Sequence, residues 1–434
     1  MRLQEISQRS QYPQTITPAM AQSPNGMENS LLPIDVCEAI IDTVQHTRRE
    51  YGMSDSTSFE YPPEQRTLMA CALTCRAWTA RAQYHLRQHP QLMDSASIGC
   101  FTTAARRASS EFAASVITLR FGRLLGAFGV LVPRPGDFFT LSFPNLRALS
   151  AFNVDLTELG SVFPRLTGIR ARPPLCQHIT RLMLLYCQFD TVRAMLDVVW
   201  SCGNLSELYI RGCRFQRNEM APGQAASMVQ ICNRLRRCVN LKFLYLHDRT
   251  FLDAEKPIPG GVFGSSLTEL QVVYGVEQAD LSAESLLNLV RGSFPALIQL
   301  TVDSSSNCIE SLPPSLPYGS LLHGIAASLA EPRSLRKVTI CSRHKDRPNC
   351  CRTLYGRSDA EESGRSLQSV LPGLTHLELE LHSSSDDTDG PCVGPPTSMS
   401  SSLHVVVRRA HSEITSSTSA IPPTIERLSP PYKR

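Results

Sequence analysis

The sequence lacks the long apolar segments of membrane and exported proteins. Its longest apolar run covers residues 124–132 and contains two glycines, whereas a membrane-spanning helix needs about 20 apolar residues. The first 15 residues contain no apolar stretch of the kind that a secretory signal carries. We therefore expect an intracellular protein, cytoplasmic or nuclear, without a membrane partner.

An excess of one charge is also missing. The chain has 43 Lys and Arg against 39 Asp and Glu, a net charge of +4, and its basic runs are short. Proteins whose main ligand is nucleic acid usually carry a larger and more clustered basic excess. The charge pattern therefore predicts no nucleic-acid partner. In an intracellular chain, the 15 cysteines are expected to be reduced and mostly buried thiols.

Motifs that would carry catalysis are absent from the sequence. It contains no Gly-Lys-Ser/Thr phosphate loop, no dinucleotide glycine fingerprint, no His-Glu-x-x-His and no Gly-x-Ser-x-Gly. We therefore expect a non-enzyme that needs no cofactor. An enzyme with a reactive cysteine remains an alternative, because Cys350 and Cys351 lie in a polar segment between Arg347 and Arg352.

One arrangement of residues looks like a zinc-finger ligand set but has the wrong spacing. Cys71 and Cys75 are followed by His85 and His89. The intervening residues continue one helical pattern, which would separate Cys75 from His85 by about 15 Å. One tetrahedral metal cannot bridge that distance, so we expect no metal site.

The two ends of the chain differ from the part between them. Residues 1–30 and 383–434 are rich in polar residues and proline without a period, which predicts disordered tails. A strand-like segment at residues 403–407 interrupts the second tail. The sequence does not indicate which part of the fold this segment joins.

Residues 31–92 contain apolar residues at the spacing that is typical of helices. Pro33 is followed by apolar residues at helical spacing, which predicts a helix that starts there. A polar stretch, residues 45–66, is expected to form a long loop. The helical pattern resumes at Thr67, a plausible N-cap residue, and continues to Leu86.

Residues 93–382 follow a repeated strand template, Leu-x-x-Leu-x-Leu. The clear copies begin 26 to 39 residues apart, and helix-like apolar segments lie between them. They start at Ile179, Leu205, Leu241, Leu267, Leu297, Leu335 and Leu374, with looser copies at Val116 and Leu146. A strand and a helix in each unit predict an α/β solenoid whose units are stabilised by their neighbours. An ordinary α/β domain with alternating strands and helices is the alternative.

Two consecutive copies extend the template in the same way. Residues 179–189 and 205–215 both continue to a cysteine, Cys187 or Cys213, and then to a phenylalanine. This pattern resembles the leucine-rich repeat, which has Asn or Cys at that position. We expect the two cysteines to stack in adjacent units just inside the turn and to react slowly. The other copies depart from the pattern, so the repeats are irregular.

The helical block resembles an F-box. That family begins with a Leu-Pro pair and an Ile-Ile helix and continues with Leu-x-x-Cys-x-Leu-x-Cys-Arg-x-Trp. The matching residues, which we expect to form the F-box core and its docking surface, are Leu32, Pro33, Ile40, Ile41, Leu68, Cys71, Leu73, Cys75 and Trp78. The loop at residues 45–66 is longer than is usual. An F-box followed by irregular leucine-rich repeats resembles the F-box families that are expanded in mushroom-forming fungi.

The resemblance implies a non-catalytic receptor with two binding ends. The F-box would dock on the Skp-type adaptor of a cullin-RING ubiquitin ligase, and the repeats would hold a protein substrate. The sequence does not identify that substrate. The alternative is a leucine-rich-repeat scaffold that is not coupled to ubiquitination.

The template also predicts where a substrate would bind. Because side chains alternate along a strand, the residues between the leucines face away from the core. Apolar side chains gather there in three neighbouring units, with charged residues at their border. The candidate substrate-binding residues are Arg181, Met183, Glu207, Tyr209, Phe243 and Tyr245, with Lys242 also at the border. Strand propensity alone would also favour tyrosine at such positions.

Overall fold

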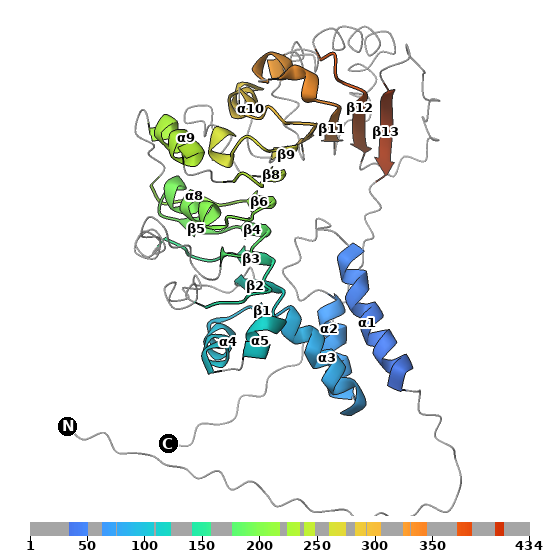
Figure 1. The fold of residues 1–434 in the computed structure, drawn as a ribbon. Helices are drawn as coiled ribbons and strands as arrows, with labels where there is room; N and C mark the ends of the chain where they lie inside the picture. The colour runs from blue at the N-terminus through green and yellow to red at the C-terminus, as the bar shows by residue number, and fades with distance from the viewer. Residues whose placement is uncertain are drawn as a thin grey trace, which may run out of the picture.

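The computed structural model of the chain describes residues 34–50, 63–74, 76–107, 110–122, 141–157, 176–217, 224–234, 238–247, 260–274, 283–291, 293–304, 324–329, 331–344, 371–383 and 404–411. Helices occupy the N-terminal part, and a long parallel sheet with further helices follows (Figure 1). The architecture is therefore mixed α/β, as the strand-and-helix pattern of the sequence predicts. None of the helices in these ranges is long and apolar enough to cross a membrane.

Three helices form a small N-terminal unit, which we call the helical unit: α1 (Ile34–Glu50), α2 (Pro63–Thr74) and α3 (Arg76–Gln88). Its core consists of Ile41, Leu68, Cys71 and Ala82, and Val44, Ala72, Trp78 and Leu86 pack partly buried against it. One buried or half-buried face on each helix therefore holds the unit together, separately from the core of the sheet.

The boundaries of these helices differ from the prediction. Helix α1 continues to Glu50, so the predicted loop does not begin at residue 45, and α2 begins at Pro63 rather than at Thr67. Proline suits the first turn of a helix because its missing N–H would have no intrahelical acceptor there. The polar composition of residues 45–66, with Gly52 and two adjacent prolines, made these segments look like a loop.

The single helix predicted from Thr67 to Leu86 was also wrong. Helix α2 ends at Thr74 and α3 begins at Arg76. The Thr79 hydroxyl donates a 2.9 Å hydrogen bond to the carbonyl oxygen of Ala72, seven residues earlier. In a continuous helix that separation would be about 10 Å, so the chain changes direction between the two helices.

The sheet contains eleven strands, and each pairs in parallel with the next in chain order. The strands are β1 (Gln91–Leu92), β2 (Thr118–Gly122), β3 (Ala148–Phe152), β4 (Arg181–Leu185), β6 (Glu207–Arg211), β8 (Phe243–His247), β9 (Glu269–Tyr274), β10 (Gln299–Ser304), β11 (Lys337–His344), β12 (His376–Ser383) and β13 (His404–His411). A second sheet pairs β5 (Gln188–Phe189) with β7 (Arg214–Phe215).

The sheet extends beyond the predicted limits of the repeat region, residues 93–382. Strand β1 precedes that region, and β13 falls in the segment that was predicted as a mostly disordered tail. The unplaced strand-like piece at residues 403–407 belongs largely to β13, in which Val405 pairs with Leu377 and Val407 with Leu379.

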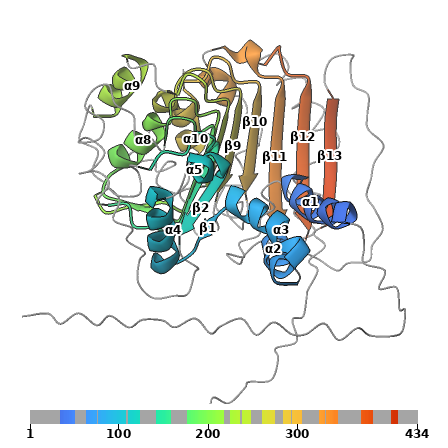
Figure 2. The same cartoon turned by 60° about the horizontal axis from the view of Figure 1, so that its bottom comes forward.

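Helices occupy the connections between strands. They are α4 (Ser95–Arg107), α5 (Ser110–Ser115), α8 (Val192–Ser201), α9 (Gln224–Arg234) and α10 (Ala283–Val290), with short 3₁₀ turns η3 (Gly260–Phe263) and η5 (Pro332–Ser334). Helices α8, α9 and α10 lie on the same side of the sheet in both views (Figures 1 and 2). Thr191 caps α8, because its hydroxyl accepts a 3.1 Å hydrogen bond from the backbone N–H of Ala194.

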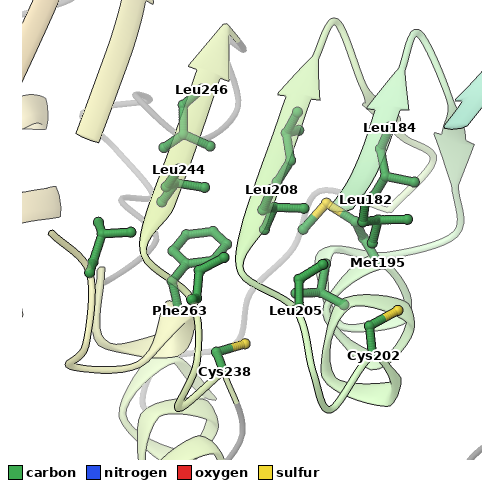
Figure 3. Packing of buried hydrophobic residues seen from close by; sticks show 14 of the residues in the cluster. Leu182, Leu184, Met195, Cys202, Leu205, Leu208, Cys238, Leu244, Leu246 and Phe263 are labelled. Carbon is green, nitrogen blue, oxygen red and sulfur yellow. The ribbon is translucent and has the colours of Figure 1, made fainter. Parts of the chain in front are cut away.

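The template leucines build the core between the sheet and these helices. Leu182, Leu208, Leu244, Leu270 and Leu300 pair directly across five consecutive strands, and all are fully buried. Figure 3 shows the leucines of β4, β6 and β8 facing Met195 of α8 and Phe263 of η3. Burying one such side chain contributes about 1.5–3 kcal/mol, so the repeat of one apolar position in every strand stabilises the whole sheet.

Cys187 and Cys213 follow β4 and β6 at the same offset, and both are buried as predicted. The Cys187 thiol lies 3.5 Å from the carbonyl oxygen of Ala151, and the Cys213 thiol lies 3.5 Å from that of Leu184. Each thiol therefore reaches the backbone of the preceding strand. Burial raises the pKa of Cys187 to about 12, which keeps this side chain a neutral thiol. Cys350 and Cys351 lie outside the described residues.

Candidate functional site

The helical unit divides the residues of its sequence motif between core and surface. Ile41, Leu68 and Cys71 are buried and Trp78 is half-buried against them. Ile40 and Leu73 are instead exposed, Ile40 to 42% and Leu73 to 88%. The unit thus uses three motif residues for its own core and presents others to the surface. Leu32, Pro33 and Cys75 lie outside the described residues.

Exposed apolar side chains on α1 and α2 occur in pairs four residues apart. Val36 and Ile40 form the pair on α1, and Met69 and Leu73 form the pair on α2. Residues four apart lie on the same face of a helix, so each helix presents a short apolar stripe. Such stripes, beside a small core, are typical of surfaces that bind a partner protein.

An ionic network links α1 to α3, and no sequence motif predicts it. The Arg81 guanidinium donates two hydrogen bonds to the Asp42 carboxylate, at 2.8 and 2.7 Å, and Nε2 of His85 lies 2.8 Å from Oδ1 of Asp42. These contacts, the Arg81 hydrogen bonds first, lower the pKa of Asp42 to about 2. Arg81 and His85 are four residues apart on one helix face, but nothing in the sequence connected them with Asp42.

Of the four residues that resembled a zinc-finger ligand set, the structure describes Cys71, His85 and His89. Cys71 is buried in the core of the helical unit, His85 contacts Asp42, and Nδ1 of His89 lies 2.8 Å from the Thr118 hydroxyl of β2. Within the described ranges, the structure places no three His, Cys, Asp or Glu side chains together as metal ligands.

The second candidate surface lies on the sheet, on the face that we call the open face, opposite the template leucines. The pairing brings its predicted residues into two rows. Arg181, Glu207 and Phe243 are in register in one row, and Met183, Tyr209 and Tyr245 are in register in the other. Met183, Glu207, Tyr209, Phe243 and Tyr245 are partly exposed, and Arg181 is exposed. The structure therefore brings all six predicted residues together. Lys242 is exposed one residue before β8 begins.

Three rings form the centre of this surface, and we call Tyr209, Phe243 and Tyr245 the aromatic patch. The ring centroid of Tyr209 lies 5.0 Å from that of Phe243 and 5.9 Å from that of Tyr245. These separations are within the range in which aromatic rings attract one another. The rings thus support one another and are held in place by two neighbouring strands.

Charged groups border the aromatic patch. The Arg181 guanidinium donates a 2.5 Å hydrogen bond to Oε2 of Glu207, and the Tyr209 hydroxyl donates a 3.3 Å hydrogen bond to the same oxygen. Burial, and then the charge of Glu207, raise the pKa of Tyr209 to about 12. Tyr209 is therefore a neutral hydrogen-bond donor at every physiological pH.

The structure adds Glu269 and Gln299 to the border of this surface. Glu269 pairs with Phe243 and continues the row of Arg181 and Glu207, and Gln299 is the next residue in that row. The Gln299 amide donates a 3.3 Å hydrogen bond to Glu269. Both residues occupy the template position before the middle leucine. The sequence therefore contained the signal, but the candidates had been limited to the three units in which apolar side chains gather.

Comparison with known proteins adds no family to this description. No protein-family model matches the sequence, and no curated protein matches it. The chain is a mixed α/β protein in which a small helical unit precedes a long parallel sheet.

Proposed function

We propose that this chain is the substrate-recognition subunit of a Skp-cullin-F-box type ubiquitin ligase. The helical unit is its F-box and docks on the Skp-type adaptor. The sheet and its helices are an irregular leucine-rich-repeat solenoid, and its open face holds the target protein. The chain itself is not an enzyme, because the ligation chemistry belongs to other subunits of the complex.

One observation carries this proposal. The segment that resembles the second F-box motif buries Leu68 and Cys71 and exposes Leu73 to 88%. A leucine that is exposed to this extent contributes little to its own fold, and with Met69, four residues earlier on α2, it forms an apolar stripe that is open to an intermolecular contact. Val36 and Ile40 form a second exposed apolar stripe, on α1.

The architecture of the sheet supports the proposal that its open face binds the substrate. Parallel strands repeat one register over successive units, so each unit adds one side chain to a continuous row on the open face. Repeat arrays of this kind present extended surfaces for protein ligands. The aromatic patch with its charged border has the composition of an interaction hot spot.

The adaptor contact is tested by a pull-down of the full chain with a purified Skp-type adaptor. Leu73→Glu should leave the circular dichroism spectrum unchanged and weaken adaptor binding about 30-fold or more, the loss typical of a hot-spot residue. Ile298→Glu is the matched control, because Ile298 is also apolar and exposed but lies outside the helical unit. Wild-type adaptor binding by Leu73→Glu would contradict the proposal and favour a repeat scaffold that is not coupled to ubiquitination.

The substrate end is tested by the double variant Tyr209→Ala, Tyr245→Ala. It should retain the adaptor and lose the proteins that co-purify with the wild-type chain. An unaltered set of co-purifying proteins would place the recognition surface elsewhere on the molecule.

A further inference from the structure

The ring of Phe243 lies between two carboxylate-bearing strands. Glu207 of β6 pairs with Phe243 of β8, and Phe243 pairs with Glu269 of β9. Neighbouring strands are about 4.8 Å apart, so Phe243 has one glutamate as its neighbour on each side. All three side chains are partly exposed on the open face. An aromatic ring with carboxylates on both sides is an environment that favours a cation.

The two carboxylates differ in how their charge is compensated. Glu207 has the Arg181 guanidinium at 2.5 Å. Glu269 accepts a hydrogen bond from the neutral amide of Gln299. Lys337 lies in the same row of residues, two strands from Glu269, and its charge lowers the pKa of Glu269. Burial and the charge of Glu207 together raise the pKa of Glu269. A further cation placed at Phe243 would therefore be stabilised most by Glu269.

The open face already contains contacts of the same kind within the chain. The Arg181 guanidinium binds Glu207, whose carboxylate also accepts the Tyr209 hydroxyl. The Arg120 guanidinium lies over the Phe152 ring, 4.2 Å from its centroid, and both residues belong to this face. The face therefore holds one guanidinium on a carboxylate and another on an aromatic ring, which are the two contacts that a guanidinium at Phe243 and Glu269 would combine.

We infer that the aromatic patch and Glu269 bind an arginine side chain of the target protein, with the guanidinium between the Phe243 ring and the Glu269 carboxylate. This inference rests on the proposed function, since it names the chemistry that the substrate surface recognises. A planar guanidinium stacks on a ring and donates paired hydrogen bonds to a carboxylate, which an ammonium group cannot do. Tyr209 and Tyr245 supply apolar surface for the aliphatic part of the side chain.

Peptide binding to the purified full chain tests this inference. The probes are four pools of fluorescent nine-residue peptides with the same random flanking residues and a central arginine, lysine, citrulline or glutamate. Fluorescence anisotropy should show the arginine pool binding at least tenfold more tightly than the citrulline pool, which has the same shape without the charge. Added salt should reduce that difference, because a partly exposed ion pair is screened.

Variants then locate the effect. Glu269→Gln should bring the arginine pool to the affinity of the citrulline pool, whereas Glu111→Gln, at an exposed carboxylate in α5, should leave the preference unchanged. Glu269→Arg should transfer the preference to the glutamate pool. This charge reversal produces a gain of binding, so a loss of folding cannot imitate it.

Three results would overturn the inference. They are no binding of any pool at millimolar peptide, equal binding of the arginine and citrulline pools, or an arginine preference that survives in Glu269→Gln. Adaptor binding is measured on the same preparations, so the two ideas fail separately. If the wild-type chain binds the adaptor but shows no arginine preference, the inference alone is overturned. If the wild-type chain prefers the arginine pool but does not bind the adaptor, only the link to ubiquitination is overturned.

Discussion

The alternation of side chains along β6 leads to a quantitative prediction for two adjacent residues. Leu208 is fully buried between its pairing partners Leu182 and Leu244, which are fully buried themselves. Tyr209, the next residue, lies half-buried on the open face. We expect Leu208→Ala to destabilise the sheet much more than Tyr209→Ala, although tyrosine is the larger side chain.

The size of each effect follows from the surroundings. A buried Leu→Ala replacement costs about 2–5 kcal/mol, and the cost is greatest where neighbours cannot move into the cavity. Leu208 has paired strands on both sides, so we expect about 3–5 kcal/mol. Tyr209→Ala loses two ring contacts, at 5.0 and 5.9 Å, each worth about 0.5–1.5 kcal/mol. We therefore expect about 1–3 kcal/mol for Tyr209→Ala.

Trp200 provides a specific assay of the sheet. It is buried in α8, and its indole N–H donates a 3.0 Å hydrogen bond to the carbonyl oxygen of Val262. The chain has two tryptophans, so a Trp78→Phe background leaves Trp200 as the only one. Urea unfolding followed by its fluorescence then gives the free energy of unfolding for each variant.

Two outcomes would refute this reasoning. If Leu208→Ala costs less than about 1 kcal/mol, the site is not the closed core that the cavity argument assumes. If Tyr209→Ala costs as much as Leu208→Ala, the two faces of the sheet are equally buried and the open face is not a free surface. In either case the assignment of Tyr209 to a binding role would lose its basis.

Two further predictions concern titration and reactivity. The pKa of Asp42 is lowered from 3.8 to about 2, so its contribution to stability is complete above pH 3.8 and is lost as the pH falls through about 2. Thermal unfolding of Asp42→Asn should therefore lose this part of the wild-type acid dependence. In alkylation followed by mass spectrometry, exposed Cys100 should react before buried Cys187 and Cys213. For Cys187, the pKa of about 12 against an ordinary 9.0 lowers the thiolate fraction about a thousandfold.

Each of these experiments has a clear contrary result. An acid dependence of Asp42→Asn identical to wild type would mean that the contacts with Arg81 and His85 do not hold α1 to α3 in solution. Alkylation of Cys187 at the rate of Cys100 in the native protein would show that the turn after β4 is open and that the repeat register is wrong.

The sequence alone was sufficient to predict the template strands, from β2 to β12, and their register, but not β1 and β13 at the two ends of the sheet. Each template copy places a leucine at the same point of its unit, and the observed pairs Leu182–Leu208 and Leu208–Leu244 follow that alignment. The reason is that a slip of one residue would turn every leucine to the open face. The six residues of the candidate substrate surface were predictable for the same reason, since alternation places them opposite the leucines.

Only the tertiary structure could decide the contacts between segments that share no local period. The break between α2 and α3, the pairing of Asp42 with Arg81, and the place of β13 at the end of the sheet are of this kind. Local periodicity depends on residues three or four apart, whereas Asp42 and Arg81 are 39 residues apart and meet because two helices pack against a common core. The hydrogen bond from the Gln299 amide to Glu269 is of the same kind, because these residues are 30 apart in sequence and their side chains meet only when the repeating units stack.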